Sequence, residues 1–230
     1  MKDSPADLVV RLEKVSRIYR HGGIEVAALR DVDLEIRRGE FAALVGPSGS
    51  GKTTLLNLIG GLDSPTSGRI WIGEAETTRL SSAQLAQVRL RHIGFVFQEY
   101  NLIPVLSALE NVEYVMLLQG VPEKDRQARA LALLKDLGLE GMEHRRPGEL
   151  SGGQQQRVAV ARAIVSEPLI VLPDEPTANL DSVAGAALLD LMRGLNETKG
   201  VTFVFSTHDP MVMQRARRII RMRDGRIVQE

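Results

Sequence analysis

The stretch from Gly46 to Thr53 reads GPSGSGKT; it follows an apolar strand pattern at Phe41–Val45 and precedes an apolar helix pattern at Thr54–Ile59. A glycine, four residues, Gly, Lys and then Ser or Thr, placed between a strand and a helix, is the pattern of a phosphate-binding loop, or P-loop. Glycines let successive backbone N–H groups point at phosphate oxygens, and the following helix adds unpaired N–H groups and its dipole. The stretch therefore predicts a site for the phosphates of a nucleotide.

Individual residues of the loop have separate expected roles. Lys52 is expected to reach the β- and γ-phosphates, and the Thr53 hydroxyl to hold a magnesium ion. A Gly-rich turn that merely joins strand to helix is the alternative, and the strand–loop–helix context favours phosphate binding over it. The candidate nucleotide-binding residues are Gly46, Pro47, Ser48, Gly49, Ser50, Gly51, Lys52, Thr53 and Thr54.

Composition is typical of a soluble globular protein. The chain has 230 residues, of which 43% are hydrophobic and 25% charged, so one large domain, or a domain with a subdomain, is expected. Lys plus Arg equals Asp plus Glu at 29 each, so bulk charge does not indicate a nucleic-acid partner. The lack of cysteine excludes disulfides, thiolate metal sites and cysteine nucleophiles. No apolar run approaches about eighteen residues, so we expect a cytosolic chain that does not span a membrane.

The order of strand and helix patterns predicts an α/β fold. Strands alternate with helices after the P-loop, which is typical of a mostly parallel sheet, whereas the opening of the chain reads as antiparallel β. Residues 99–166 are mainly helical in pattern. We therefore expect a single nucleotide-binding domain over 1–230. It would have a P-loop NTPase core with an antiparallel β part at 1–98 and 167–230, and an inserted α-helical subdomain at 99–166. Leu131, Leu134 and Leu137 are expected to form an apolar core stripe in that subdomain.

A second apolar strand pattern, Leu169–Leu172, runs into Pro173, Asp174 and Glu175. Ligands gather at the carboxyl ends of parallel strands, so these carboxylates are expected beside the P-loop. Asp174 would contact hydrated magnesium, and Glu175 would orient or deprotonate the attacking water. Two acids that only solvate a turn are the alternative, which the P-loop disfavours. Pro173 lacks the N–H that a sheet ladder uses, so we expect it where strand pairing has ended.

The sequence LSGGQ at Leu150–Gln154 opens a predicted helix. Glycines and a serine hydroxyl at a helix N-terminus can form a second anion site, although the same pattern is often only a helix cap. The P-loop already supplies the backbone N–H groups that one γ-phosphate needs from its own chain. A second such anion site therefore suggests that LSGGQ binds the phosphate of a nucleotide held by another chain. The candidates are Leu150, Ser151, Gly152, Gly153 and Gln154.

These motifs together resemble ATP-binding-cassette ATPases along essentially the whole chain. The matching residues, in family order, are Gly46–Thr53, Gln98, LSGGQ at Leu150–Gln154, DEPT at Asp174–Thr177, Asn179-Leu180-Asp181 and His208. The phrases GGLDSPTSG, GFVFQEYNLIP and ENVEY are similar to the subgroup that serves lipoprotein release, macrolide export, antimicrobial-peptide resistance and cell division. Pro173 and the pair Ala178-Asn179 depart from the common pattern, but neither removes a reacting group.

The resemblance implies a head-to-tail homodimer or pseudodimer that holds two ATP molecules, each between one chain's P-loop and its partner's LSGGQ. Tyr19 would stack on adenine; the alternative is that Tyr19 is an aromatic residue of the hydrophobic core. Gln98 would touch magnesium and water while its loop senses the membrane partner, and His208 would contact the γ-phosphate. Asp181 would belong to a loop linking the two sites, although helix capping alone also explains it.

An ATP-hydrolysing subunit of a membrane transporter or mechanotransmission complex is the function that the resemblance implies. It would use Mg²⁺ with ATP, bind integral membrane permease subunits and no nucleic acid, and lie peripherally on the cytoplasmic face of the cell (inner) membrane. Catalytic candidates are Lys52, Gln98, Glu175 and His208, and metal-ligand candidates are Thr53, Gln98 and Asp174. The alternatives are a soluble cassette protein of DNA repair or translation and a non-hydrolysing ATP-sensing module.

Overall fold

The computed structural model describes residues 7–22 and 24–229, and this part of the chain forms two sheets. The first is antiparallel, with the strand order β2-β1-β4-β5; the second has the order β10-β9-β3-β8-β7-β6 and is parallel except for β10. The strands are β1 (Leu8–His21), β2 (Ile24–Arg37), β3 (Phe41–Val45), β4 (Ser67–Ile72), β5 (Ala75–Glu76), β6 (Ile93–Val96), β7 (Ile170–Pro173), β8 (Phe203–Thr207), β9 (Arg218–Arg223) and β10 (Arg226–Gln229). The α/β fold with an antiparallel N-terminal part and a mostly parallel sheet is confirmed.

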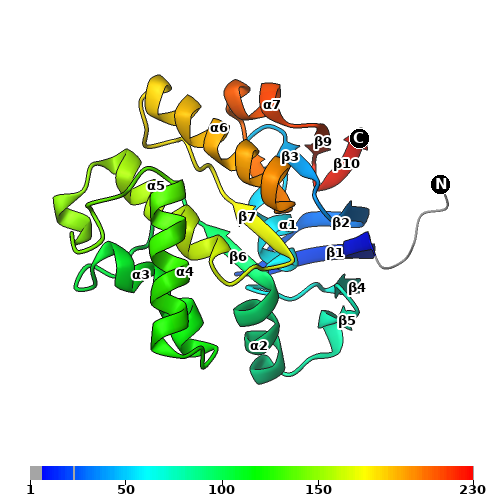
Figure 1. The fold of residues 1–230 in the computed structure, drawn as a ribbon. Coiled ribbons are helices and arrows are strands. Elements are labelled where there is room, and N and C mark those ends of the chain that lie inside the picture. The colour runs from blue at the N-terminus through cyan, green and yellow to red at the C-terminus, as the bar shows by residue number, and fades with distance from the viewer. Residues whose placement is uncertain (1–6, 23, 230) are drawn as a thin grey trace.

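Helices cover the parallel sheet and also form a group of their own. They are α1 (Lys52–Ile59), α2 (Ser82–His92), α3 (Ala108–Leu118), α4 (Glu123–Asp136), α5 (Gly152–Ile164), α6 (Ser182–Lys199) and α7 (Pro210–Arg215), with short 3-10 turns η2 (Thr77–Arg79) and η3 (Pro147–Glu149). Figure 1 shows α3, α4 and α5 gathered on one side of the molecule, away from β1 and β2. A serine caps α3, because the Ser107 hydroxyl accepts from the N–H of Glu110.

The central strand β3 separates two hydrophobic cores. Its residues alternate between them: Phe41, Ala43 and Val45 pack with the helices α3 to α6, whereas Ala42 and Leu44 pack with α1 and the antiparallel sheet. All five residues of β3 are buried, as expected for a parallel strand covered on both faces. The P-loop therefore follows directly on a fully buried strand.

The apolar stripe expected at Leu131, Leu134 and Leu137 is correct at the last two positions and wrong at the first. Leu131 is 42% exposed, and the buried residues of α4 are Ala130, Leu133 and Leu134. Leu134 and Leu137 do pack in the core, so the buried face is turned by about one residue from the predicted stripe. In the N-terminal hairpin, β1 runs from Leu8 to His21, and several register irregularities interrupt its pairing with β2.

Pro173 lies inside β7, paired with Val96 of β6, which corrects the expectation that pairing has ended there. The N–H groups of Val171 and Glu175 point to β8, donating to Thr202 and Ser206, and that of Asp174 points to β6. In this alternation the nitrogen of Pro173 faces β8. The proline therefore removes one rung of the β7–β8 ladder and leaves the β6–β7 ladder intact.

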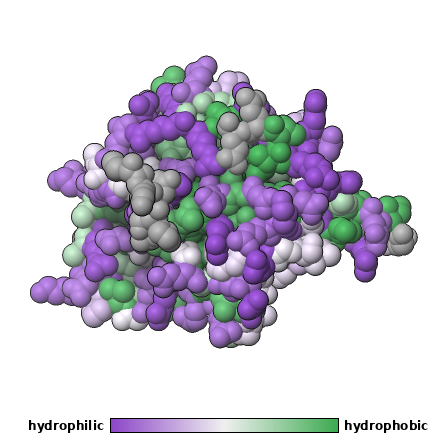
Figure 2. Space-filling model, turned by 90° about the vertical axis from the view of Figure 1, so that its right-hand side faces the viewer, coloured by the Kyte–Doolittle hydropathy of each residue, from purple (hydrophilic) through white to green (hydrophobic). Residues whose placement is uncertain are grey.

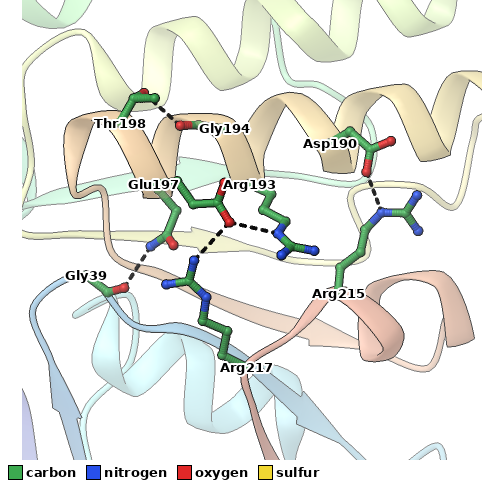
Figure 3. A network of polar contacts seen from close by, with 9 residues as sticks. Gly39, Asp190, Arg193, Gly194, Glu197, Thr198, Arg215 and Arg217 are labelled. Atoms are coloured by element: carbon green, nitrogen blue, oxygen red, sulfur yellow. Dashed lines mark hydrogen bonds and ion pairs between the residues drawn. The ribbon is translucent and has the colours of Figure 1, made fainter.

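A polar network fastens α6 to its neighbours. The Glu197 carboxylate accepts from Arg193 of the same helix and from Arg217, which precedes β9, both at 3.0 Å (Figure 3). The buried amide of Asn196 donates to the carbonyl of Gly39 at 2.8 Å, in the turn between β2 and β3. Exposed ion pairs are worth little in stability. The buried hydrogen bond from Asn196 to Gly39 therefore does more to fix the position of α6 than the exposed ion pairs of Glu197 do.

The face shown in Figure 2 is mainly hydrophilic, with hydrophobic side chains exposed in a few places. Within residues 7–22 and 24–229, none of the helices combines the length and the apolar character needed to cross a membrane.

Candidate functional site

The P-loop joins β3 to α1 and lies at the surface, with Pro47 and Ser48 exposed. The Lys52 Nζ donates to the backbone carbonyls of Gly46 at 2.8 Å and Pro47 at 3.2 Å. Helix α1 begins at Lys52, and the preceding Gly51 gives it no side-chain cap. The first N–H groups of the helix are thus available to an anion.

Two glycines of the loop are required by their surroundings. A Cβ on Gly46 would lie 2.3 Å from the carbonyl oxygen of Met222, in β9. Gly51 has a φ of 102°, and a Cβ there would lie 2.6 Å from the carbonyl oxygen of Ala28, in β2. Both sheets therefore press against the loop and fix its path.

The carboxyl ends of β7 and β8 place acidic groups near the loop. Asp174 follows β7, and its N–H donates to the Val96 carbonyl at 2.9 Å. Burial raises the pKa of Asp174; the Ser206 hydroxyl and Lys52 counteract this, and Glu175 adds to it. Asp174 therefore lies at the same edge of the parallel sheet as the P-loop, because β3 and β7 both pair with β8.

Glu175 is held by the end of β8 through three contacts. Its N–H donates to the Ser206 carbonyl at 2.9 Å, and its Oε2 accepts from the Thr207 hydroxyl at 2.9 Å. Its Oε1 lies 2.6 Å from the Nδ1 of His208, which is largely exposed. Glu175 itself has a φ of 45°, in the left-handed region. The predicted pair Glu175 and His208 is thus brought together, and Glu175 is held in an unusual backbone conformation.

Thr207 and Asp209 support this arrangement, and sequence reasoning missed both. The Thr207 hydroxyl, which donates to Glu175, accepts from the N–H of Asp209 at 2.9 Å. The Asp209 carboxylate accepts from the Thr177 hydroxyl at 2.6 Å and caps α7 at Met211. The available signal was position, since Thr207 precedes His208 at the carboxyl end of a parallel strand.

Gln98 follows β6 at the same edge of the sheet and is exposed. Its backbone carbonyl accepts from the side-chain amide of Asn179 at 2.9 Å. Asn179 lies in the loop before α6, whose first residues are capped by Asp181: its carboxylate accepts from the N–H groups of Val183 at 2.9 Å and Ala184 at 2.8 Å. The predicted capping role of Asp181 is present, and its side chain is also exposed.

The LSGGQ segment forms an exposed helix N-terminus. Ser151 caps α5, accepting from the Gln154 N–H at 3.3 Å, while the Gln154 side chain accepts from the Ser151 N–H at 2.9 Å. Leu150 is buried. The recorded neighbours of Gly152 are Tyr100 and Asn179, not the P-loop of the same chain.

Tyr19 lies in β1 and is 38% exposed. Its hydroxyl donates to Asp63 at 2.8 Å, and the Arg17 guanidinium lies 4.6 Å from the centre of its ring. Arg17 also pairs with Asp63 at 2.7 Å. One face of the ring is therefore covered by a cation, and the core alternative for Tyr19 does not describe its position.

Comparisons with known proteins agree with this arrangement. A protein-family model described as ABC transporter matches residues 29–178. An uncharacterised ABC transporter ATP-binding protein of Thermotoga maritima is 51% identical over 95% of this chain and 93% of its own length. The lipoprotein-releasing system ATP-binding protein LolD of Chromohalobacter salexigens is 44% identical over 99% of this chain and 98% of its own.

A longer relative and a solved structure extend the likeness. The macrolide export ATP-binding/permease protein MacB of Syntrophobacter fumaroxidans is 46% identical over 96% of this chain, which spans only 31% of that protein. A dimeric post-hydrolysis structure of the ATP-binding cassette MJ0796, bound to ADP and Pi, superimposes with a TM-score of 0.87 at 45% identity, covering 96% of this chain and 97% of that one. With a family model matching well over half of its length and relatives that match it almost from end to end, the chain belongs to the ABC transporter family.

Proposed function

We propose that the chain binds and hydrolyses ATP as the motor subunit of a membrane transporter or mechanotransmission complex. The observation that carries this proposal is the edge of the parallel sheet where Lys52, Asp174, Glu175 and His208 meet. Phosphoryl transfer depends mainly on positioning and charge stabilisation, and these groups supply both.

ATP binds at the P-loop, with its phosphates on the N–H groups that begin α1. The Lys52 ammonium, which now donates to the carbonyls of Gly46 and Pro47, turns to the β- and γ-phosphates. The loop residues to Thr54 surround the phosphates, and the free face of the Tyr19 ring stacks on adenine. The opposite face of the Tyr19 ring stays in contact with the Arg17 guanidinium when adenine stacks.

The residues present also fit the Mg²⁺ that accompanies ATP. Asp174 is a partly buried carboxylate whose pKa is raised by burial, so an adjacent cation would compensate its charge. Thr53 and Gln98 add a hydroxyl and an amide oxygen, which suit an ion that prefers oxygen ligands. When bound, the ion would neutralise charge on the phosphates.

Glu175 acts on the water that attacks the γ-phosphate. Its carboxylate accepts the proton of that water as the new P–O bond forms and the bond to the bridging oxygen of ADP breaks. Thr207 keeps one carboxylate oxygen in place. His208 moves from the other oxygen to the γ-phosphate, and Gln98 contacts the water.

The second half of each site comes from a second copy of the chain. Ser151, Gly152, Gly153 and Gln154 present a capped helix N-terminus at the surface, with Leu150 as its buried anchor. Two chains arranged head to tail bring this segment to the partner's ATP, and Asp181 lies in the loop between the two sites.

The partner in the membrane is a permease subunit. In relatives the ATP-binding unit is either separate, as in LolD, or part of a longer ATP-binding/permease protein, as in MacB. Exposed apolar side chains on and before α3, namely Val105, Leu117 and Leu118, offer a contact surface in residues 99–166, which we propose to be a helical subdomain. The chain would then act on the cytoplasmic face of the cell membrane.

A Glu175→Gln variant tests the hydrolytic role. A general base contributes about 10²–10⁴-fold, so ATP turnover, measured as phosphate release, should fall within that range. ATP binding should persist, and an ATP-bound dimer should accumulate in light scattering after gel filtration. Glu140→Gln is the control, because Glu140 is exposed and pairs with Lys135 at 2.9 Å, away from the site. Wild-type turnover in Glu175→Gln would refute the role, and a non-hydrolysing wild-type chain would favour the ATP-sensing alternative.

A further inference from the structure

A half-buried arginine binds the segment that follows Gln98. Arg162 lies in α5, and its guanidinium donates to the carbonyl of Asn101 at 2.5 Å and to that of Tyr100 at 2.8 Å. Both of its recorded partners are backbone carbonyls rather than carboxylates. Burial lowers the pKa of Arg162 from its high ordinary value, and hydrogen bonds from a desolvated charge are stronger than neutral ones. The contact is therefore a strong link between α5 and this segment.

The backbone that Arg162 holds is in an unfavourable conformation. Tyr100 has a φ of 60° and Asn101 a φ of 48°, two successive non-glycine residues in the left-handed region. A side chain makes this conformation unfavourable, less so for asparagine than for tyrosine. It persists only where surrounding contacts over-determine it. The two carbonyls that accept from Arg162 belong to these same two residues.

Two further contacts hold the segment from other sides. The Asn179 amide donates to the Gln98 carbonyl at 2.9 Å. The Tyr100 hydroxyl lies so close to Gly152 that a Cβ there would be 2.8 Å away. The segment Gln98–Asn101 is thus fixed to the LSGGQ helix and to the loop before α6 at the same time.

We propose that Arg162 is a positioning residue for Gln98. By holding the Tyr100 and Asn101 carbonyls, it sets the direction in which the chain leaves β6 and so the place of the Gln98 side chain at the site. The link also makes α5 and Gln98 move together, so that a contact made by Gln98 with its own ATP is passed to the helix that meets the partner's ATP. This inference rests on the proposed role of Gln98 in hydrolysis.

A double-mutant cycle on the full chain tests the inference. Arg162→Met should lower kcat for ATP hydrolysis by about 10- to 100-fold, because small misplacements of a catalytic group are costly. Arg162→Lys, which can reach one carbonyl but not two, should lie between wild type and Arg162→Met. If Arg162 acts through Gln98, Arg162→Met should change kcat by less than about twofold in a Gln98→Ala background.

Arg157→Met is the matched control. Arg157 lies on the same helix and its guanidinium also donates to a carbonyl, that of Leu137 at 3.3 Å, away from Gln98. This variant should keep kcat within about twofold of wild type. Hydrogen exchange gives a second readout: the amides of 98–101 should exchange faster in Arg162→Met than in Arg157→Met.

Each outcome decides the matter. The positioning role would be overturned if the fold-losses in kcat caused by Arg162→Met and Gln98→Ala multiply in the double variant. It would also be overturned if Arg162→Met loses no more activity than Arg157→Met. Either result would leave the role of Gln98 intact. Wild-type kcat in Gln98→Ala would instead refute the proposed role of Gln98, and the inference with it. If Arg162→Met does not fold, the same cycle with Arg162→Lys gives the answer.

Discussion

Asp174 is the residue at which the demands of folding and of catalysis conflict most clearly. The fold buries its carboxylate near Lys52 and Glu175, and burial raises its pKa. The folded chain therefore binds the proton of Asp174 more tightly than the unfolded chain does. As pH rises above about 3.9, the ordinary pKa of aspartate, ionising this group costs the folded state stability.

Asp174→Asn should accordingly stabilise the nucleotide-free chain while impairing magnesium-dependent ATP hydrolysis. The gain in free energy of unfolding over wild type should be small at about pH 4, grow as pH rises toward the folded-state pKa, and then level off. Urea unfolding of both proteins across this pH range measures the difference. A difference that is independent of pH would show that the carboxylate is not a strained group in the fold.

Other site residues differ in how far sequence could predict them. Lys52 and Thr53 could be assigned because the P-loop is a local pattern in which spacing fixes position. Arg162 could not, since the carbonyls that it binds are more than sixty residues away in the chain. Backbone carbonyls carry no sequence signal, so only the structure reveals such a link.

At the scale of elements, Asn111 of α3 organises the connection from β6. It is fully buried, and its amide donates to the carbonyls of Ile103, Leu106 and Ser107 at 2.9–3.1 Å. Its Oδ1 accepts from the N–H of Ile103 at 2.8 Å. One side chain thus contacts four backbone groups of the loop that leads from the site to α3, with its two N–H hydrogens shared among three carbonyls.

Asn111→Leu should therefore lower the free energy of unfolding by about 3–5 kcal/mol, because each lost hydrogen bond costs about 1 kcal/mol and the orphaned groups cost more. Urea denaturation measures the change. Gln127→Leu on α4 is the control, since its amide makes one contact with Glu123 at 3.3 Å. An equal, small loss in both variants would contradict this account.

Helices and strands were predicted correctly where a local sequence pattern determines them. Predictions failed where contacts with other helices or strands determine the structure. Strand β3 and the caps Ser107 and Ser151 follow from neighbouring residues. The misplaced face of α4 at Leu131 reflects which helices pack against it. Pro173 reads as a strand breaker, yet it is accommodated because β7 loses only its rung to β8 and keeps its pairing with β6.

At the scale of the whole molecule, two exposed glycine-rich helix starts face different neighbours. The P-loop lies between the two sheets, whereas Gly152 of the LSGGQ segment lies against Tyr100 and Asn179. Arg162 and Asn179 connect these parts at Gln98. Such a layout suits a motor in which each copy supplies one half of two shared sites.

The distance between Ser151 and ATP in a nucleotide-bound dimer tests the shared site most directly. The structure to determine is that of Glu175→Gln with Mg²⁺ and ATP, in which hydrolysis is blocked. We predict that the Ser151 Oγ of one protomer lies within about 3 Å of a γ-phosphate oxygen of the ATP held by the other protomer's Lys52, a hydrogen-bonding distance. An assembly in which Ser151 faces solvent, with no triphosphate within reach, would contradict the account.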